Sequence, residues 1–287
     1  MSLADLVATT TQRLAAAGVP SPEADAQLIV GHLLGISRGE VLARQHRGDE
    51  ASSELQGAVD ALVIRREKRE PLQHLLGVAP FMSFEVAVGP GVFIPRPETE
   101  SLATHAIAVA TGLGVGDQGV TIVDVCAGSG VLAIALQREV SWASVTAVEA
   151  SADAFVYLEK NVAALAPEVS LRLETVAEAE TAFLPGSVDL VVSNPPYVPV
   201  GEIPNEPEVS DYDPPEALFG GVDGMDVVSQ VISFAQRNLR SGGVLMMEHA
   251  NVQGESVRNL MENAGFRLVQ TEQDLLGRDR FTHGVWS

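Results

Sequence analysis

The chain has 287 residues, of which 46% are hydrophobic and 20% are charged. This composition predicts a globular protein with one large domain or two smaller ones, and it excludes global disorder. Cys126 is the single cysteine, so no intramolecular disulfide can form. The formal net charge of −20 repels a phosphate backbone and disfavours nucleic acid as a partner, although acidity that serves only solubility remains an alternative explanation.

The N-terminal residues, Met1–Val19, lack the basic start and the unbroken apolar run of a signal peptide. The sequence also has no apolar stretch of about 18 residues, the length that a membrane helix needs. We therefore predict a cytoplasmic protein without a membrane span.

The first 70 residues show the apolar spacing of helices. One predicted helix starts near Leu3 and ends at Gly18, and the next begins with Ser21 as its N-cap and Pro22 at its first position, and ends at Gly35. Further helices are predicted around Gly39–Arg44 and over Ser52–Glu70. The last of these ends in the basic run Arg65–Arg69, which is interpreted either as a solvated helix end or as a docking site for a partner.

Between Phe81 and Ile94 the apolar residues alternate with polar ones, which is typical of strands. The turn residues Gly89-Pro90-Gly91 separate Phe84–Val88 from Val92–Ile94. The pattern predicts a β-hairpin that links two domains.

The remaining residues alternate between strand and helix patterns, which predicts an α/β domain with a parallel sheet covered on both faces. The predicted strands are Val120–Val125, Ser144–Val148, Ser170–Thr175, Val188–Ser193, Gly243–Glu248, Phe266–Thr271 and Phe281–Val285, and the predicted helices are Val131–Arg138, Asp153–Leu165, Met225–Leu239 and Gly254–Ala264. The predicted domains are thus 1–77, which is helical, a hairpin linker over 78–97, and 98–287.

A loop of small residues, Cys126-Ala127-Gly128-Ser129-Gly130, follows the first of these strands and precedes a helix. Small residues let the backbone approach a ligand, and a helix N-terminus offers free N–H groups. Glu149 ends the next strand, where an acid accepts hydrogen bonds from a ribose diol. Together they predict a nucleoside-containing cofactor; a structural turn and a helix-starting surface acid are the alternatives.

A second motif, Asn194-Pro195-Pro196-Tyr197, follows the strand Val188–Ser193. The two prolines fix the backbone and lack N–H donors, so their carbonyls are pure acceptors. Asn194 adds a side-chain oxygen and Tyr197 a flat ring, a set that suits a planar NH2 group on a carbonyl or an aromatic ring. A proline-rich turn without a ligand is the alternative.

Both motifs are expected to share one crevice, because the strands that precede them are predicted neighbours at the switch point of a doubly wound sheet. The six histidines show no close pairing with each other or with Cys126, and we predict no metal site. A long loop from Pro199 to Gly224 is interpreted either as a lid that contacts a protein substrate or as a solvated excursion.

The chain resembles the class I S-adenosylmethionine-dependent methyltransferases, and within them the family that methylates the glutamine of the Gly-Gly-Gln motif of peptide-chain release factors on its side-chain N5. The likeness spans nearly the whole chain. It is carried by the two motifs above and by three further segments, Glu70–Gly77, Phe93–Glu100 and Glu248-His249 with Gln253-Gly254. Pro95–Glu100 combined with Asn194–Tyr197 is specific to this family, whereas amino methyltransferases that act on adenine share the second motif.

The resemblance implies a Rossmann-like domain with a seven-stranded, mostly parallel sheet whose last strand is antiparallel. It implies S-adenosylmethionine as cofactor and a release factor as partner, recognised with the help of residues 1–77. The implied cofactor residues are Cys126, Ala127, Gly128, Ser129, Gly130, Glu149, Ala177, Asn194, Phe93 and Arg96. The implied substrate grip is Asn194, Pro195, Pro196 and Tyr197.

Two positions depart from the family pattern. Cys126 stands where glycine is usual, and we interpret it as one small residue replacing another rather than as a reactive thiol. The acid often found after the third strand is absent near Val176 and Ala177, so these residues are predicted to offer adenine only backbone and packing.

Two rival functions remain open from the sequence. One is an N6-adenine or other exocyclic-amino methyltransferase on DNA or RNA, which would use the Asn194–Tyr197 motif on a flipped base. The net charge and the lack of an evident basic recognition domain argue against it. The other is a domain that binds cofactor or partner without turnover, which the intact motifs disfavour.

Overall fold

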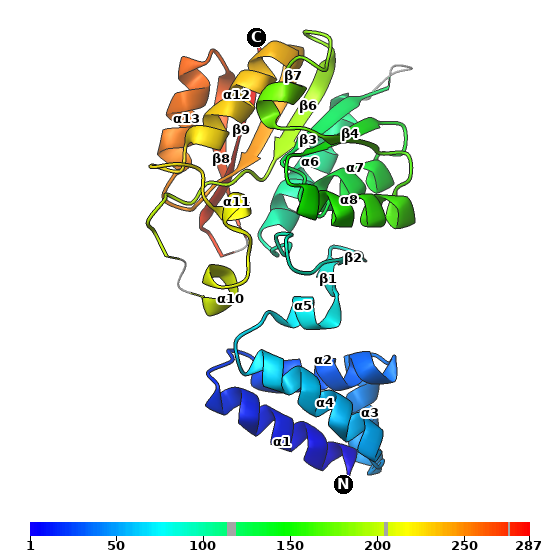
Figure 1. Ribbon diagram of the computed structural model, residues 1–287. Coiled ribbons are helices and arrows are strands. Elements are labelled where there is room, and N and C mark those ends of the chain that lie inside the picture. The colour runs from blue at the N-terminus through cyan, green and yellow to red at the C-terminus, as the bar shows by residue number, and fades with distance from the viewer. Residues whose placement is uncertain (114–118, 204–205, 275) are drawn as a thin grey trace. The chain divides into compact units, whose positions relative to one another are not determined.

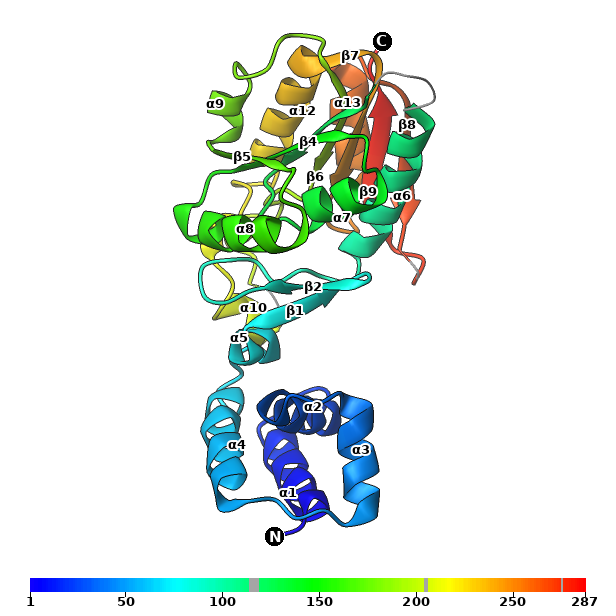
Figure 2. The ribbon, with the colours of Figure 1, turned by 90° about the vertical axis from the view of Figure 1, so that its right-hand side faces the viewer.

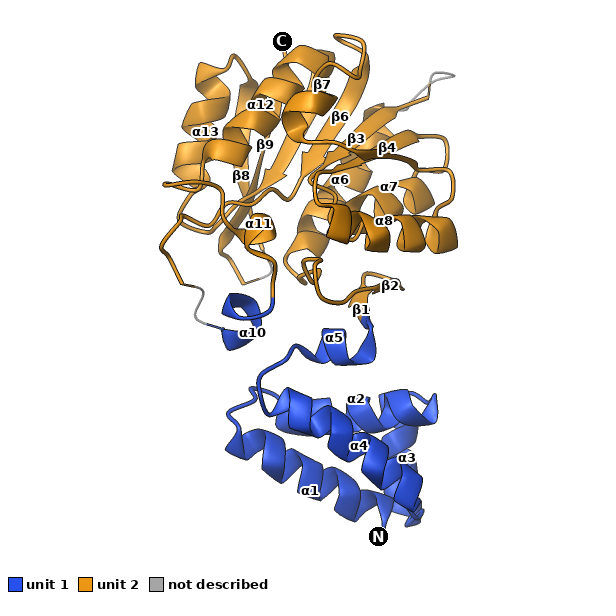
Figure 3. Ribbon diagram, in the orientation of Figure 1, with its two compact units in different colours: residues 1–78, 204–212 blue, residues 79–203, 213–287 orange. Residues whose placement is uncertain are grey.

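The computed structural model describes residues 1–113, 119–203, 206–274 and 276–287, shown as coloured ribbons in Figure 1. The chain divides into two compact units, coloured separately in Figure 3. Unit 1 consists of Met1–Val78 and Pro204–Tyr212, and unit 2 of Ala79–Ile203 and Asp213–Ser287. The segment that ends at Tyr212 therefore lies far from the rest of unit 1 in sequence.

Unit 1 is helical, as its apolar spacing predicts. Its helices are α1 (Leu3–Ala16), α2 (Pro22–Leu34), α3 (Arg38–Arg47), α4 (Ser53–Arg66), α5 (Leu72–Leu76) and α10 (Pro207–Ser210). Serine hydroxyls cap three of them, because Ser2, Ser37 and Ser52 each accept the backbone N–H three residues on. Pro22 starts α2 and Gly35, in the left-handed conformation, ends it, as predicted.

The apolar faces of these helices form one core, with Leu14, Ile29 and Val63 fully buried in it. Helix α4 ends at Arg66, earlier than the predicted Glu70. The reason lies in the following turn, where Arg69 has a φ of 66°, outside the right-handed helical region. Leu72–Leu76 forms the separate short helix α5.

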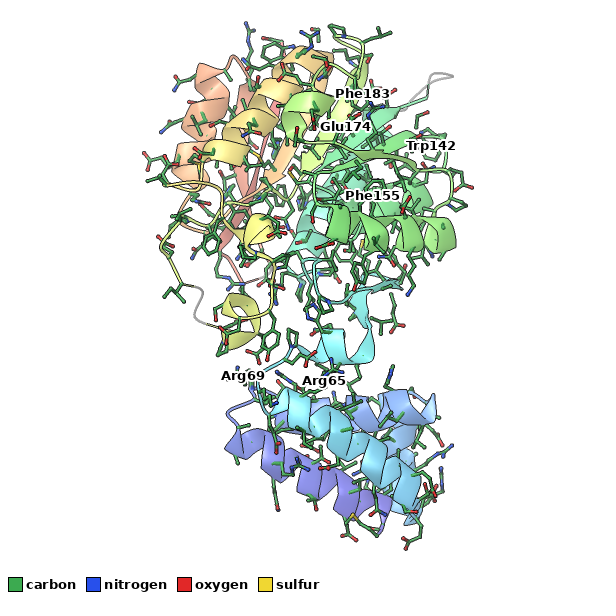
Figure 4. The ribbon with its side chains drawn as sticks, in the orientation of Figure 1. Arg65, Arg69, Trp142, Phe155, Glu174 and Phe183 are labelled. Carbon is green, nitrogen blue, oxygen red and sulfur yellow. The ribbon has the colours of Figure 1, made fainter. Side chains whose placement is uncertain are left out.

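The basic run at the end of α4 is an internal ion-pair network of unit 1. Arg66 is 5% exposed, and its guanidinium donates to Asp25 Oδ2 and to Glu208 Oε1, each at 2.8 Å. Arg69 donates two further bonds to Glu208, at 2.8 and 2.6 Å. Arg65, labelled with Arg69 in Figure 4, pairs with Glu70. The interpretation as a solvated helix end fits Arg65 and Lys68, which are exposed, but not Arg66, which is buried in this network. The interpretation as a docking site stays a prediction.

Unit 2 is built on a seven-stranded sheet with the order β5-β4-β3-β6-β7-β9-β8. The strands are β3 (Thr121–Val125), β4 (Ser144–Glu149), β5 (Ser170–Leu173), β6 (Val188–Ser193), β7 (Leu239–Glu248), β8 (Arg267–Gln273) and β9 (Asp279–Val285). The pairs from β5 to β7 are parallel, and β9 runs antiparallel to both β7 and β8. The predicted Rossmann-like fold, with its reversed last strand, is confirmed.

Helices cover both faces of the sheet, as Figures 1 and 2 show from two sides. Successive residues of β7 alternate between the two faces: Met246 packs into one apolar core with α6, α7 and α8, and Leu245 into the other with α9, α12 and α13. The helices are α6 (Thr99–Leu113), α7 (Val131–Glu139), α8 (Ala152–Leu165), α9 (Val176–Ala179), α11 (Pro215–Leu218), α12 (Asp226–Asn238) and α13 (Gly254–Asn263).

The β-hairpin is present, but the predicted strand pairing was wrong. The pairing strands are β1 (Val78–Phe81) and β2 (Phe84–Ala87), joined at Met82-Ser83, and Val92–Ile94 is not a strand. The Asn161 side chain donates to the Ala87 carbonyl and accepts from the Ala87 N–H, at 3.0 and 2.7 Å. These bonds occupy the backbone groups that a strand over Val92–Ile94 would have needed.

In the ranges that the structure describes, no helix has both the length and the apolar character needed to cross a membrane.

Candidate functional site

The loop of small residues lies between the carboxyl end of β3 and the start of α7. Gly128 has a φ of 56° and Gly130 a φ of 88°, conformations that favour glycine. A Cβ atom added at Gly130 would lie 2.6 Å from Leu158 Cδ1, which is too close for contact. Glycine at 130 is therefore required both by the turn and by the packing of α8 against it.

Cys126 opens this loop with a φ of 62°, a conformation that residues with a side chain rarely adopt. Its side chain therefore stands at a strained backbone position. Burial raises the pKa of the Cys126 thiol, as do the nearby carboxylates of Glu149 and Asp124. This supports the interpretation of Cys126 as a packed residue rather than a reactive thiol.

Glu149 ends β4 and is bonded to the loop. One carboxylate oxygen accepts the N–H of Gly128 and the other that of Ser151, each at 2.7 Å. Burial raises the pKa of Glu149, and these hydrogen bonds oppose that shift. Because each carboxylate oxygen accepts more than one hydrogen bond, Glu149 keeps capacity for a ribose diol.

Asp124 is a member of this site that the sequence analysis did not single out. It is fully buried in β3, and its Oδ2 accepts the N–H of Ala133 at 3.0 Å. Its Oδ1 is buried and has no hydrogen-bond partner among the described residues. Burial raises the pKa of Asp124 to about 8. The signal in the sequence was an acid inside an otherwise apolar strand.

The Asn194–Tyr197 motif lies beside the loop of small residues, as predicted. Strands β3 and β6 pair in parallel with Val125 opposite Ser193, so Cys126 and Asn194 follow paired residues. The Ser193 hydroxyl donates to the Val125 carbonyl at 2.6 Å and joins the two strand ends. This is where the sheet order reverses, the place where α/β folds bind ligands.

Two acceptors of the motif are open. Asn194 is half-buried, and its Nδ2 donates to Thr99 Oγ1 at 3.5 Å. In the described part of the chain, neither Asn194 Oδ1 nor the Pro195 carbonyl accepts a hydrogen bond. Both oxygens are therefore acceptors that no described donor occupies, and their predicted role towards a ligand stays a prediction.

The backbone of the motif is held by glycines from the loop that follows it. A Cβ atom at Gly220 would lie 2.4 Å from the Pro196 oxygen, and one at Gly224 would lie 2.2 Å from the Tyr197 oxygen. Gln253 Nε2 donates to the same Tyr197 oxygen at 2.8 Å. These contacts hold Pro196 and Tyr197, the two residues that follow the acceptors of Asn194 and Pro195.

Phe93 and Arg96 lie together on the segment before α6. The Arg96 guanidinium carbon is 5.2 Å from the centroid of the Phe93 ring, and Arg96 Nη2 donates to Asp213 Oδ2 at 2.8 Å. The Asp213 side chain is fully buried. Asp213 thus positions Arg96, a role that the sequence of the loop from Pro199 to Gly224 does not reveal.

The residues expected near an adenine ring lie at the start of α9, where Thr175 and Glu178 form a capping box. Val176 is buried and Ala177 is exposed. Nearby, Arg172 Nη2 pairs with Glu174 Oε1 at 2.6 Å. The Arg172 guanidinium carbon also lies 5.9 Å from the centre of the Phe183 ring; Glu174 and Phe183 are labelled in Figure 4.

His249 is packed rather than open to the site. It is fully buried, with Nδ1 2.8 Å from the Ala250 carbonyl and Nε2 2.8 Å from Thr282 Oγ1. Burial lowers the pKa of His249, which favours the neutral ring. Over the residues with described positions, no group of three or more His, Cys, Asp or Glu is placed to hold a metal ion.

Comparison with known proteins extends over both units. A family described as PrmC N-terminal domain matches residues 5–77, and one described as methyltransferase small domain matches residues 109–204. Among solved structures, the 16S rRNA N2 G1207 methyltransferase of T. thermophilus, in complex with AdoMet and guanosine, is similar with a TM-score of 0.54 and 24% identity. That match covers 73% of this chain and 50% of that one, and it shows the fold alone.

Curated relatives match almost the full length. The release factor glutamine methyltransferase of Streptomyces coelicolor is 45% identical over 279 residues, which cover 96% of this chain and 95% of that protein. The protein of the same name from Mycolicibacterium smegmatis is 43% identical over 277 residues, covering 96% and 94%. The chain belongs to the family of release factor glutamine methyltransferases.

Proposed function

We propose that this chain transfers a methyl group from S-adenosylmethionine to the side-chain amide nitrogen of the glutamine in the Gly-Gly-Gln motif of a peptide-chain release factor. One observation carries the proposal. Asn194 Oδ1 and the Pro195 carbonyl are acceptors that no donor among the described residues occupies. They follow the end of β6, which pairs with the end of β3, where the loop Cys126–Gly130 begins.

The residues present fit the cofactor. The Asp124 Oδ1 atom is buried without a partner, which suits the ammonium group of a methionine moiety. Glu149 suits the ribose hydroxyls, and Gly128 and Gly130 let the backbone approach the ligand. We assign Cys126, Ala127, Ser129 and Ala177 to the same site, with Phe93 and Arg96 beside it.

S-adenosylmethionine supplies a methyl group on a sulfonium, whose leaving group departs neutral. The protein must therefore solve the problem of the nucleophile, an amide nitrogen whose lone pair is delocalised into its carbonyl. Asn194 Oδ1 and the Pro195 carbonyl accept hydrogen bonds from the two N–H groups of the amide and hold its nitrogen in place. These hydrogen bonds strengthen as positive charge develops on the nitrogen, which stabilises the transition state. The amide nitrogen gains the methyl group as the sulfur–methyl bond breaks, and it gives up one N–H proton through its acceptor to water, with S-adenosylhomocysteine as the second product.

The same acceptors select glutamine over glutamate. A carboxylate brings a negative charge and no N–H donor, so it would face two acceptor oxygens without a hydrogen bond. The backbone of Pro196 and Tyr197 has little room to turn and relieve that repulsion, because Gly220 and Gly224 pack directly against it. Tyr197 contributes the ring that lies against the planar amide.

The substrate is a protein, and residues 1–77 help to recognise it. We expect the reaction in the cytoplasm, without a membrane partner and without direct binding of nucleic acid, in line with the net charge of −20. Filter binding across a salt series checks the last point, since strong, salt-sensitive binding of DNA or RNA would favour an adenine substrate instead.

Mass spectrometry tests the proposal directly. A release factor incubated with the protein and S-adenosylmethionine should gain the mass of one methylene on the peptide that contains its Gly-Gly-Gln motif. A release factor with that glutamine replaced by glutamate is the control and should stay unmodified. An unmodified wild-type release factor would overturn the proposal.

The Asn194→Ala variant tests the role of the side-chain acceptor. Loss of one such transition-state hydrogen bond should lower kcat by about 10²–10³-fold, while cofactor affinity measured by calorimetry changes only a few-fold. Asn259→Ala, at an exposed position of α13, is the matched control and should keep wild-type turnover. Near-normal turnover of Asn194→Ala would discard this role.

A further inference from the structure

A chain of side chains behind Asn194 runs to a buried acid. Asn194 Nδ2 donates to Thr99 Oγ1 at 3.5 Å, and the Thr99 hydroxyl donates to Glu248 Oε2 at 2.8 Å. Glu248, the last residue of β7, is 1% exposed, and its second oxygen accepts from the Tyr197 hydroxyl at 3.3 Å. Thr99, the first residue of α6, is 2% exposed.

The carboxylate of Glu248 sets which group donates and which accepts in each of these hydrogen bonds. A carboxylate only accepts hydrogen bonds, so it fixes the single hydroxyl proton of Thr99 on the side of Glu248. The remaining lone pairs of Thr99 Oγ1 then accept only from a donor, which is the Nδ2 group of Asn194. The opposite end of the Asn194 amide, Oδ1, is left to face the ligand as an acceptor.

We propose that Glu248, acting through Thr99, is a positioning residue that orients the Asn194 amide so that its oxygen meets the N–H of the substrate glutamine. This inference rests on the function proposed above. The two ends of an asparagine amide have nearly the same shape, so packing alone does not choose between them. A hydrogen-bond chain that ends in an obligate acceptor makes that choice.

Protonation of Glu248 reverses the direction of the hydrogen bonds that link it through Thr99 to Asn194. A neutral carboxylic acid donates to Thr99 Oγ1, and the Thr99 hydroxyl then donates towards Asn194. The amide turns to accept with Oδ1, and its NH2 group faces the NH2 group of the substrate. Two donors meet, the substrate loses one of its hydrogen bonds, and the methyl acceptor is no longer held.

The surroundings of Glu248 place this switch near neutral pH. Burial raises the pKa of Glu248 to about 7, and the nearby charge of Glu98 acts in the same direction. The Thr99 and Tyr197 hydroxyls and the positive charge of Arg280 on β9 oppose the shift. Because this folded-state pKa lies above the ordinary value, Glu248 is mostly charged only above about pH 7. There the hydrogen bonds run from Asn194 to Thr99 to Glu248, and this direction is lost as the pH falls.

The long Asn194–Thr99 distance fits a chain that is completed on binding. Hydrogen bonds in a site without its ligand are often long and tighten once the substrate is in place. A substrate N–H at Asn194 Oδ1 polarises the amide and strengthens its Nδ2–H donor towards Thr99.

Three variants test the positioning role under saturating cofactor and substrate. Thr99→Val removes the hydroxyl with little change in shape and should lower kcat about 10-fold or more, whereas Thr99→Ser keeps the hydroxyl and should stay within about 3-fold of wild type. Thr104→Val, the same change at an exposed position of α6, is the control and should leave kcat unchanged. Wild-type kcat in Thr99→Val would overturn the inference.

The pH profile separates positioning from a structural role. Wild-type kcat should fall as the pH drops below about 7, and Glu248→Gln should have a lower kcat without that acidic limb. Saturating cofactor removes any contribution from the titration of Asp124, since that acid acts on cofactor binding. Persistence of the full acidic limb in Glu248→Gln would overturn the inference.

A readout without turnover keeps this test distinct from that of the proposed function. In protein labelled with 15N-asparagine, the Asn194 side-chain amide signal, identified by its absence in Asn194→Ala, should shift with a midpoint near pH 7. Glu248→Gln should abolish the shift. A titrating signal in a protein that methylates no release factor would refute only the proposed function, and a signal that does not titrate would refute only the positioning role.

Discussion

Acidic side chains are buried in both units of the molecule, but different forces act on them. In unit 1, Glu208 lies between Arg66 and Arg69; burial raises its pKa, and the hydrogen bonds from the two arginines outweigh that effect and lower it. At the carboxyl end of the sheet in unit 2, burial dominates and raises the pKa of Asp124 to about 8 and that of Glu248 to about 7.

This difference separates acids held in ion pairs from acids in which desolvation dominates. Paired acids stay charged and hold helices together, whereas desolvated acids stay poised to bind, donate or change charge. Strongly raised pKa values therefore cluster where the sequence motifs predict a ligand.

The largest expected effect concerns the pairing in unit 1. Arg66→Ala leaves the buried carboxylate of Asp25 without its arginine and Glu208 with Arg69 alone, and it should cost about 3–5 kcal/mol of unfolding free energy. Arg65→Ala, which removes a half-exposed partner of Glu70, is the control and should cost no more than about 1 kcal/mol. Urea unfolding followed by far-ultraviolet circular dichroism measures both.

The two tryptophans locate the loss. Trp142 and Trp286 both lie in unit 2, so their fluorescence follows that unit alone. In Arg66→Ala the dichroism midpoint should fall further than the fluorescence midpoint. An equal decrease in the two midpoints would mean that the two units unfold together. The difference between their buried acids would then not appear as a difference in stability.

The next effect has the opposite sign and concerns Glu248. Its folded-state pKa of about 7 lies above the ordinary value of 4.5, so its burial favours the protonated form. The contribution of Glu248 to stability should therefore fall as the pH rises from 4.5 through 7, by about 1.4 kcal/mol per pH unit. Glu248→Gln should therefore be more stable than wild type by about 3 kcal/mol above pH 7, and equal to it below pH 4.5.

Glu208→Gln provides the matched comparison for that measurement. Because the pKa of Glu208 is lowered, its contribution is present above the ordinary pKa of a glutamate and is lost as the pH falls through the folded-state value. Glu208→Gln should accordingly be less stable than wild type at neutral pH and approach it in acid. Pulse proteolysis across pH gives both curves, and curves of the same sign would break the comparison.

The sequence predicts the fold and the position of the site because both depend on local patterns. Alternating apolar residues mark the strands, and a glycine loop and an Asn-Pro-Pro-Tyr segment each follow one of them. The register of β3 and β6 then places Cys126 beside Asn194. The predicted residue roles at this site stay predictions.

The sequence does not reveal the residues that position the predicted site residues, because their roles arise only from tertiary contacts. Thr99 and Glu248 are 149 positions apart in sequence, and Arg96 and Asp213 are 117 apart. The hairpin was misassigned for the same reason, since Asn161 occupies the backbone groups of Ala87 from 74 residues away. No spacing rule within one element foretells such contacts.

The smallest expected effect is at Cys126, where strain and side-chain contacts oppose each other. A non-glycine residue at a φ of 62° costs about 1–2 kcal/mol, which Cys126→Gly would relieve. Glycine adds about 0.5–1 kcal/mol of backbone entropy to the unfolded state and gives up the packing of the thiol, so the net change should lie within about 1 kcal/mol. Cys126→Val, branched at Cβ, should instead cost about 2 kcal/mol at the same φ.

The thiol itself tests whether burial governs titration at this end of the sheet. Burial raises the pKa of Cys126, so at pH 8 the folded protein should react with iodoacetamide far more slowly than the urea-unfolded chain, in which the thiol is free to ionise. The same desolvation raises the pKa values of Asp124 and Glu248. Equal labelling rates in the folded and unfolded protein would show that water reaches this strand end, and burial would then not explain the raised pKa of Asp124 on the same strand.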